Sequence, residues 1–127
     1  DGAILNGGAI MADDKVETIR SSSSGVIGRA ESVTRGQRLI LDSSARPQPD
    51  ALTNSEAFLA GVSSCGVTLI EGYAKEKGIP VRRMDVTIEG VRPAADPARF
   101  SSITMSFELA GVSQADAEKL VETYRSR

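Results

Sequence analysis

Few residues of this sequence could act as nucleophiles or metal ligands, and the most reactive type occurs once. The 127 residues contain a single cysteine, Cys65, and no histidine. The absence of imidazole excludes Ser-His-Asp and Cys-His systems, general base catalysis by histidine and zinc sites built on histidine. One cysteine also excludes a cysteine-rich metal site and an internal disulfide, so we expect no metal and no cofactor. Cys65 and the serine, threonine and lysine residues remain as candidate nucleophiles.

Cys65 lies in a segment with helical periodicity. Large and apolar side chains recur there at helical spacing, in a stripe formed by Phe58, Val62, Cys65, Leu69 and Tyr73. A stripe of this kind predicts that Cys65 is a small buried residue, as most free cysteines are. The helix N-terminus is three turns away and cannot lower the pKa of the thiol, because the dipole effect fades within one turn. A reactive thiolate would therefore need a cation from another element.

Glu56 is the second candidate site residue. It stands three residues after Thr53, and the two form a capping box at the start of the helix. Nine residues separate Glu56 from Cys65, which places them half a turn apart around the helix and about 13.5 Å apart along it. If these two side chains work together, they must come from different chains. The alternative is that Glu56 only caps the helix.

The elements around this helix predict an α+β fold. The helix ends at Gly78, and Pro80 follows. Gly90–Phe100, with two prolines, reads as a loop, and Ser21–Gly25 as another. The expected order is β-β-β-α-β-β-α, with strands over 16–20, 28–34, 38–41, 84–89 and 103–109, a helix over 53–78 and a second helix that begins at Ser113.

A second seam on the long helix predicts a homodimer. This seam consists of small side chains, namely Ala57, Gly61, Ser64, Thr68 and Gly72. Small residues let another backbone approach closely, and a chain of this length offers few partners for a helix with two faces to bury. We therefore expect an obligate dimer with the helices crossing at its interface. The alternative is a monomer whose helix lies on one sheet.

Composition and charge exclude several classes of partner and location. Fifteen basic and 17 acidic residues are scattered without a basic stripe, so we expect no nucleic-acid partner. The longest apolar runs are far shorter than the ~20 residues that span a bilayer, which predicts no membrane segment. A lone thiol without a disulfide framework favours the cytoplasm. Residues 1–10 are interpreted as an expression leftover or disordered extension, and residues 11–127 as one domain with Met11 a plausible start.

Two segments of the chain resemble the OsmC/Ohr family, the osmotically induced and organic hydroperoxide resistance proteins. They are EAFLAGVSSC over residues 56–65 and YAKEKGIP over residues 73–80. The family has an acidic residue at the helix start, an Ala/Leu-rich run and a small residue before a cysteine, and the likeness extends over about residues 16–125. It implies an intertwined homodimer and a thiol peroxidase.

The resemblance also implies roles for individual residues. Cys65 matches the cysteine that attacks an organic hydroperoxide and becomes a sulfenic acid, and Glu56 matches the acidic residue at the helix start. In the family an arginine, held by a glutamate, stabilises the thiolate. Arg20, Arg29 and Arg38 are the candidates for that arginine. In the family, a second cysteine on the later helix closes a disulfide, and a dithiol reductant resets the enzyme. This sequence has no second cysteine, and the family's Cys-Pro falls near residues 126–127, so the resemblance implies a C-terminally truncated domain.

Two alternatives belong to different functional classes. One is a non-catalytic dimer of the same fold that binds an apolar small molecule at its interface, with Cys65 merely buried. The other is a purely structural interaction domain. The reactivity of Cys65 distinguishes them, because only the enzyme requires a thiol of lowered pKa that consumes peroxide.

Overall fold

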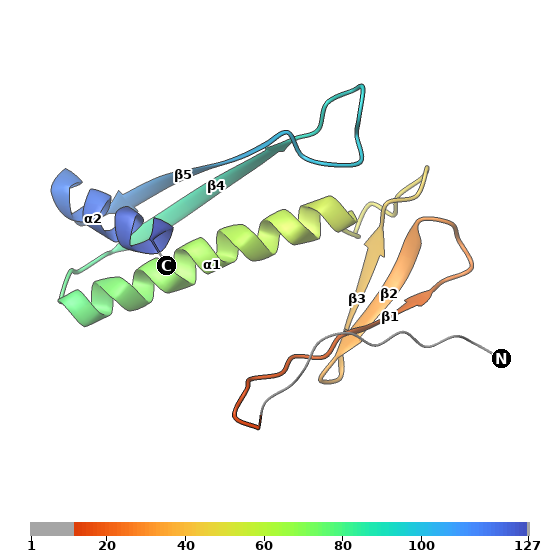
Figure 1. The fold of residues 1–127 in the computed structure, drawn as a ribbon, viewed down its shortest axis with the longest axis horizontal. Helices are drawn as coiled ribbons and strands as arrows, with labels where there is room; N and C mark the ends of the chain where they lie inside the picture. The colour runs from red at the N-terminus through yellow and green to blue at the C-terminus, as the bar shows by residue number, and fades with distance from the viewer. Residues whose placement is uncertain (1–11, 127) are drawn as a thin grey trace.

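The structure is a computed structural model that describes residues 12–126. Seven elements follow one another in the predicted order: β1 (Arg20–Ser23), β2 (Arg29–Thr34), β3 (Gln37–Asp42), α1 (Asn54–Lys77), β4 (Arg83–Val91), β5 (Ser102–Ala110) and α2 (Gln114–Arg125). Strands β1–β3 form one antiparallel sheet and β4–β5 another (Figure 1). The α+β prediction is confirmed. The predicted extension over residues 1–10 lies outside the described residues.

Helix α1 has the ends that its sequence predicts. The Thr53 hydroxyl accepts a hydrogen bond from the Glu56 N–H at 3.1 Å, and Glu56 Oε1 accepts one from the Thr53 N–H at 2.9 Å. This reciprocal capping satisfies two backbone donors that a helix start leaves unpaired. At the other end Gly78 takes a left-handed conformation with φ of 68°, which glycine adopts without strain.

The β1–β3 sheet, which we call the arm (residues 20–42), differs from the prediction at its first strand. We expected a strand over 16–20 and a loop over Ser21–Gly25, but β1 comprises Arg20–Ser23. The prediction was wrong because strand formation here depends on the partner and not on the strand's own apolar alternation. Ser21 faces Ser32 of β2, and their hydroxyl groups form a cross-strand hydrogen bond of 2.8 Å.

Helix α1, the β4–β5 hairpin and α2 form the body of the protomer. Alternate residues of β4 turn toward α1, and the register pairs Val86 with Phe107. Helix α2 begins after Ser113, as predicted, and the Ser113 hydroxyl accepts a hydrogen bond from the Asp116 N–H. The fully packed core is small and consists of Ile70, Tyr73, Ala74 and Leu120.

The predicted apolar stripe of α1 is only partly its buried face, because Tyr73 is buried but three other members of the stripe are exposed. Phe58 and Leu69 are 54% and 44% exposed, and Cys65 is exposed too. The buried residues of α1 are Gly66, Ile70, Tyr73 and Ala74. Periodicity located the helix but not its packed side, because the close contact at Gly66 selects the face that meets the hairpin.

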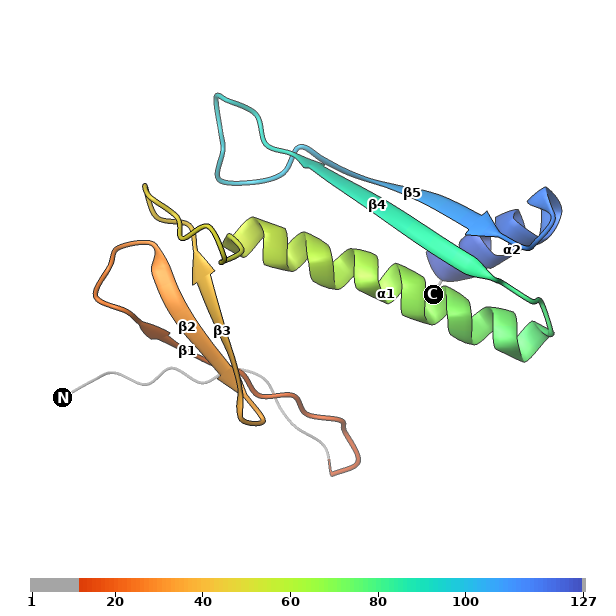
Figure 2. The same cartoon turned by 180° about the vertical axis from the view of Figure 1, so that it is seen from behind.

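The arm and the hairpin lie on opposite sides of α1. The arm stands near the N-terminal end of the helix, whereas the hairpin runs along it and α2 covers its later half (Figures 1 and 2). The accessible surface is 10063 Å². A compact monomer of 13.4 kDa would expose about 6,500 Å². The protomer therefore leaves much surface that a compact fold would bury.

Helix α1 is also long and apolar enough to cross a membrane by length and composition, with 24 residues and a mean hydropathy of 1.3 over its most apolar window. This is a weak indication, because the core helix of a soluble protein meets the same criterion. The absence of a membrane segment stays a prediction.

Candidate active site

Cys65 lies on a side of α1 that the described part of the chain leaves uncovered. We call this side the open face, and its exposed residues are Phe58, Gly61, Ser64, Cys65, Thr68, Leu69 and Gly72. A side chain placed at Gly61 or Gly72 would meet no atom within 4 Å. The open face therefore contains most of the predicted small-residue seam together with the thiol.

The opposite side of the same helical turn is tightly packed. A Cβ at Gly66 would lie 3.1 Å from Met105 Cε, 3.6 Å from Phe107 and 3.8 Å from Tyr124. The rings of Phe107 and Tyr124 meet edge to face at 5.9 Å, and the Tyr124 hydroxyl lies 3.9 Å from the Met105 sulfur. These contacts hold the turn that carries Cys65 firmly against the hairpin.

Glu56 and Cys65 do not meet within one chain. Both belong to the same continuous helix and both are exposed, so the separation expected from their spacing holds. One oxygen of the Glu56 carboxylate is already engaged by the Thr53 N–H. In the protomer Glu56 is therefore a helix cap, and a role near a thiol would involve a second copy.

Phe100 is a neighbour of the open face that sequence reasoning missed. Its ring stacks on Phe58 with a centroid distance of 6.3 Å and an interplanar angle of 21°. A Cβ at Gly90 would fall within 2.8 Å of Phe100 Cδ1, so glycine is needed there to let the ring pack. The only sequence feature that could have indicated this packing is that Phe100 is a single aromatic residue at the end of a proline-containing loop. The stack places an apolar wall two helical turns before Cys65.

The three candidate arginines differ in what already binds them. Arg29 donates from Nε to Asp42 Oδ2 at 2.7 Å, and Arg38 pairs with Glu31. Arg20, on β1, has no hydrogen-bond or ion-pair partner within residues 12–126. The Cys65 thiol has no such partner there either. Arg20 is thus the candidate whose guanidinium is free to serve another group.

Asp42 is a buried acid that sequence reasoning also missed. It is 0% exposed at the end of β3. The hydroxyl of Ser44 beside the carboxyl group is the largest influence on the pKa of Asp42 and lowers it. Hydrogen bonds from the Gln48 N–H, from Arg29 and from the Ser44 N–H lower it further and outweigh the opposing effect of burial. Asp42 is therefore a carboxylate in the folded protein.

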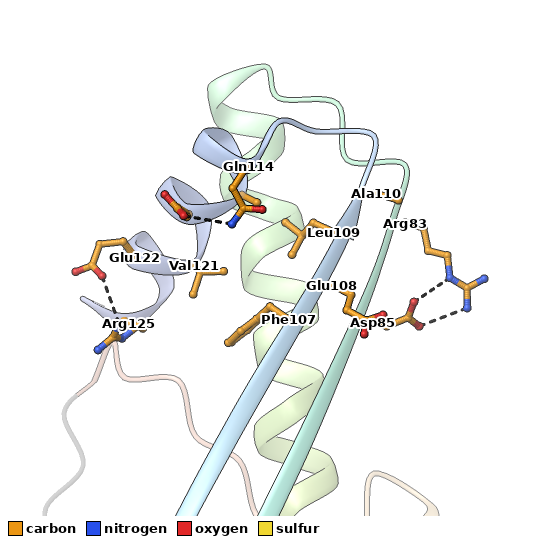
Figure 3. A pocket seen from close by; sticks show the side chains of 12 residues that line it. Arg83, Asp85, Phe107, Glu108, Leu109, Ala110, Gln114, Val121, Glu122 and Arg125 are labelled. Carbon is orange, nitrogen blue, oxygen red and sulfur yellow. Dashed lines mark hydrogen bonds and ion pairs between the residues drawn. The ribbon is translucent and has the colours of Figure 1, made fainter.

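A groove in the body of the protomer lies away from the thiol. This open groove of about 670 Å³ runs between β5 and α2, and its floor includes Phe107, Leu109 and Val121 (Figure 3). Neither Cys65 nor Glu56 lines it. Charged groups at its rim bind one another, as in the Arg83–Asp85 pair at 3.0 Å. The groove therefore presents no convergent set of free polar groups. Within residues 12–126 no cluster of His, Cys, Asp and Glu could hold a metal ion.

Solved structures share this fold. An OsmC-like protein from Mycoplasma pneumoniae superposes with a TM-score of 0.76 at 18% identity, covering 90% of this chain and 83% of that one. An organic hydroperoxide resistance protein OsmC from Legionella pneumophila superposes with a TM-score of 0.65 at 24% identity. The match covers 85% of this chain and 80% of that one. An organic hydroperoxide resistance protein from Elizabethkingia anophelis superposes with a TM-score of 0.69 at 14% identity. The match covers 88% of this chain and 82% of that one. At such identities the likeness shows the fold alone.

Sequence comparison identifies the family independently of the fold. No curated protein matches the sequence. The family model described as OsmC-like protein matches residues 47–127, which is more than half of the chain. The match includes Glu56, Cys65 and both helices. The chain therefore belongs to the OsmC-like family.

Proposed function

We propose that this protein is a thiol peroxidase that reduces organic hydroperoxides through Cys65 and works as a homodimer. The observation that carries the proposal is the position of Cys65, exposed on the open face of α1 above the packed Gly66. The names of structural relatives, which include organic hydroperoxide resistance proteins, support the substrate class.

The proposed chemistry is an oxygen transfer to sulfur. The Cys65 thiolate attacks one peroxide oxygen, an S–O bond forms and the O–O bond breaks. The alkoxide that leaves takes up a proton and becomes an alcohol. Sulfur is oxidised to a sulfenic acid and the peroxide is reduced. A dithiol reductant then attacks the sulfenic acid, releases water and forms a mixed disulfide, which its second thiol resolves to regenerate Cys65.

A second copy of the chain would complete this site. Within residues 12–126 no cation contacts Cys65, and the open face carries Phe58 and Leu69 exposed to water. Helices packed across a two-fold axis would bury the small-residue seam of this face. We propose that Arg20 of one copy stabilises the thiolate of the other and that Glu56 holds this arginine. The cytoplasm, where dithiol reductants keep thiols reduced, is the proposed location.

The test is peroxide turnover with a matched control. Cumene hydroperoxide and excess dithiothreitol are mixed with the protein, and peroxide loss is followed against Cys65→Ser. The proposal expects loss that depends on Cys65 and on dithiothreitol. Equal rates for the two proteins would refute it.

The second candidate is a dimer that binds an apolar small molecule without chemistry. The stacked Phe58 and Phe100 beside the open face favour it, because exposed aromatic surface is typical of ligand grooves. This function predicts an unreactive Cys65 and a lipid retained through purification. Native mass spectrometry of the dimer would detect such a ligand.

A further inference from the structure

Asp42 is a buried carboxyl group that the proposed chemistry leaves unused. Both of its carboxylate oxygens are occupied. Oδ2 accepts from Arg29 Nε at 2.7 Å and from the Gln48 N–H at 2.9 Å, while Oδ1 accepts from the Ser44 N–H at 3.0 Å. A buried carboxylate satisfied this fully fixes the groups around it, because each would lose a partner if it moved.

The donors to Asp42 belong to both sides of a junction. Arg29 opens β2 of the arm, whereas Ser44 and Gln48 belong to residues 43–53, which connect the arm to α1 and which we call the joint. The carboxylate therefore ties the arm to the joint, on which α1 begins.

Backbone hydrogen bonds close the joint around the same point. The Asp42 N–H donates to the Leu52 carbonyl at 2.8 Å, and the Ser43 N–H donates to the Gly28 carbonyl at 2.8 Å. The Ser43 hydroxyl accepts from the N–H of Asn54, the first residue of α1, at 3.0 Å. These bonds leave the arm little freedom to rotate about the start of the helix.

Gly28 shows how closely the arm and the joint approach each other. Its φ is 92°, and a Cβ there would lie 2.7 Å from the Ser44 Cα. Any other residue would be strained in this conformation and would push the joint away. The approach of Ser44 to β2 is thus built into the sequence.

We propose that Asp42 is a positioning residue, which locks the arm to α1 and thereby sets where Arg20 stands relative to Cys65 of a second copy. The placement of Arg20 rests on the proposed function, whereas the lock does not. Arg20 lies on β1, which is two strands away from β3 and the joint, so a rotation at the joint displaces Arg20 more than it displaces β3.

The lock is tested by amide hydrogen exchange on Asp42→Asn. The isosteric amide removes the charge that binds Arg29. We expect amide exchange at position 42, at Ser43 and at Asn54 to become at least ~10-fold faster, while the other amides of β2 and β3 stay protected. Unchanged exchange at the joint would overturn the lock. If Asp42→Asn does not fold, Ser43→Ala removes only the acceptor for Asn54 and loosens the same joint.

The positioning role is tested by the pH dependence of Cys65 alkylation. We expect the midpoint of Asp42→Asn to move up toward ~8.5, the value of a free thiol, while circular dichroism keeps the helical signal. The matched control is Asp85→Asn, which breaks an exposed Asp–Arg pair on β4 and should leave the midpoint unchanged.

The outcomes separate this inference from the proposed function. In one outcome the alkylation midpoint of Cys65 is low in the unmodified protein and equally low in Asp42→Asn, while amide exchange at the joint is faster in the variant. This result overturns the positioning role alone. A midpoint at or above ~8.5 in the unmodified protein overturns the proposed function and the placement of Arg20, and exchange at the joint still decides the lock.

Discussion

Gly66 packs directly against Met105, with only 3.1 Å between the position of a Cβ and the Met105 Cε. Because Gly66 follows Cys65 in the helix, this contact decides which way the thiol faces. The helix turns its glycine toward the hairpin and its cysteine away from it. A larger residue at position 66 would separate α1 from β5 and release the turn on which the thiol stands.

Gly66→Val should therefore destabilise the protein by about 1–3 kcal/mol, the usual cost of overpacking a core contact. Urea unfolding at one protein concentration measures the loss. Ala115→Val, on the exposed side of α2, introduces the same side chain without a core neighbour and should stay within about 0.5 kcal/mol. Equal stability of the two variants would mean that the Gly66 contact is not tight.

Gly61→Leu should abolish the dimer and leave the protomer folded. The position is exposed, and a Cβ there meets nothing within 4 Å, so the single chain accommodates a side chain. Two helices packed at the small-residue seam would not, because leucine would force them apart. Sedimentation velocity measures the change, with Ala115→Leu as the control. A monomeric unmodified protein would contradict the seam hypothesis outright.

The sequence predicted what depends on local chemistry. The capping box at Thr53 and the glycine stop at Gly78 both depend on residue types that few others can replace, and both are present. The alternation over 84–89 and 103–109 likewise identified the hairpin, because one of its faces packs on α1 and α2.

What depends on tertiary contacts could not be predicted from periodicity. The apolar stripe through Cys65 looked like the core face, yet the glycine at 66 draws the hairpin to the neighbouring face. The serines of β1 become a strand only because β2 offers partners. Asp42 belongs to no sequence motif, because its hydrogen-bond donors Arg29, Ser44 and Gln48 come close to it only in the folded chain.

Acid should remove a stabilising contribution that belongs to Asp42. Its folded pKa is lowered, so the carboxylate stabilises the fold above its unfolded pKa of ~3.9, and this contribution is lost as the pH falls from there toward the folded value. Asparagine does not titrate. The stability gap between the unmodified protein and Asp42→Asn should thus be constant from pH 7 to 5 and narrow below ~4.

Urea midpoints across this range measure the gap. Asp85→Asn serves as the control, because the pKa of Asp85 is also lowered, by the hydrogen bond and charge of Arg83, but on an exposed strand. Its smaller gap should nearly vanish in high salt, whereas that of Asp42 should persist. A gap for Asp42 that does not depend on pH would show that the acid is not charged in the folded state.

Arg20→Ala should raise the alkylation midpoint of Cys65 toward ~8.5, because it removes the cation proposed to stabilise the thiolate. Arg38→Ala is the matched control, since Arg38 is bound to Glu31 on the same sheet and should leave the midpoint unchanged. The rate of iodoacetamide labelling as a function of pH measures both. A higher midpoint in Arg38→Ala but not in Arg20→Ala would show that the assignment of the cation to Arg20 is wrong.

Excess hydroperoxide without a thiol reductant should drive Cys65 to a sulfinic acid. The sulfenic acid formed in the first turnover normally condenses with a nearby thiol, and this 127-residue chain has no second cysteine to supply one. Two copies of Cys65 could pair only with their Cα atoms within about 7 Å, and the seam at Ser64 and Thr68 runs beside the thiol rather than through it.

The chain should therefore complete about one turnover and stop. Intact-mass spectrometry should show the addition of two oxygen atoms, absent in Cys65→Ser. Cys65 is exposed in the protomer, whereas the apolar stripe predicts a buried thiol. Dithiothreitol present from the start should thus intercept the sulfenic acid and sustain turnover as long as the dimer leaves the thiol accessible. An unmodified Cys65 after peroxide treatment, or sustained turnover without any thiol, would show that the proposed chemistry is wrong.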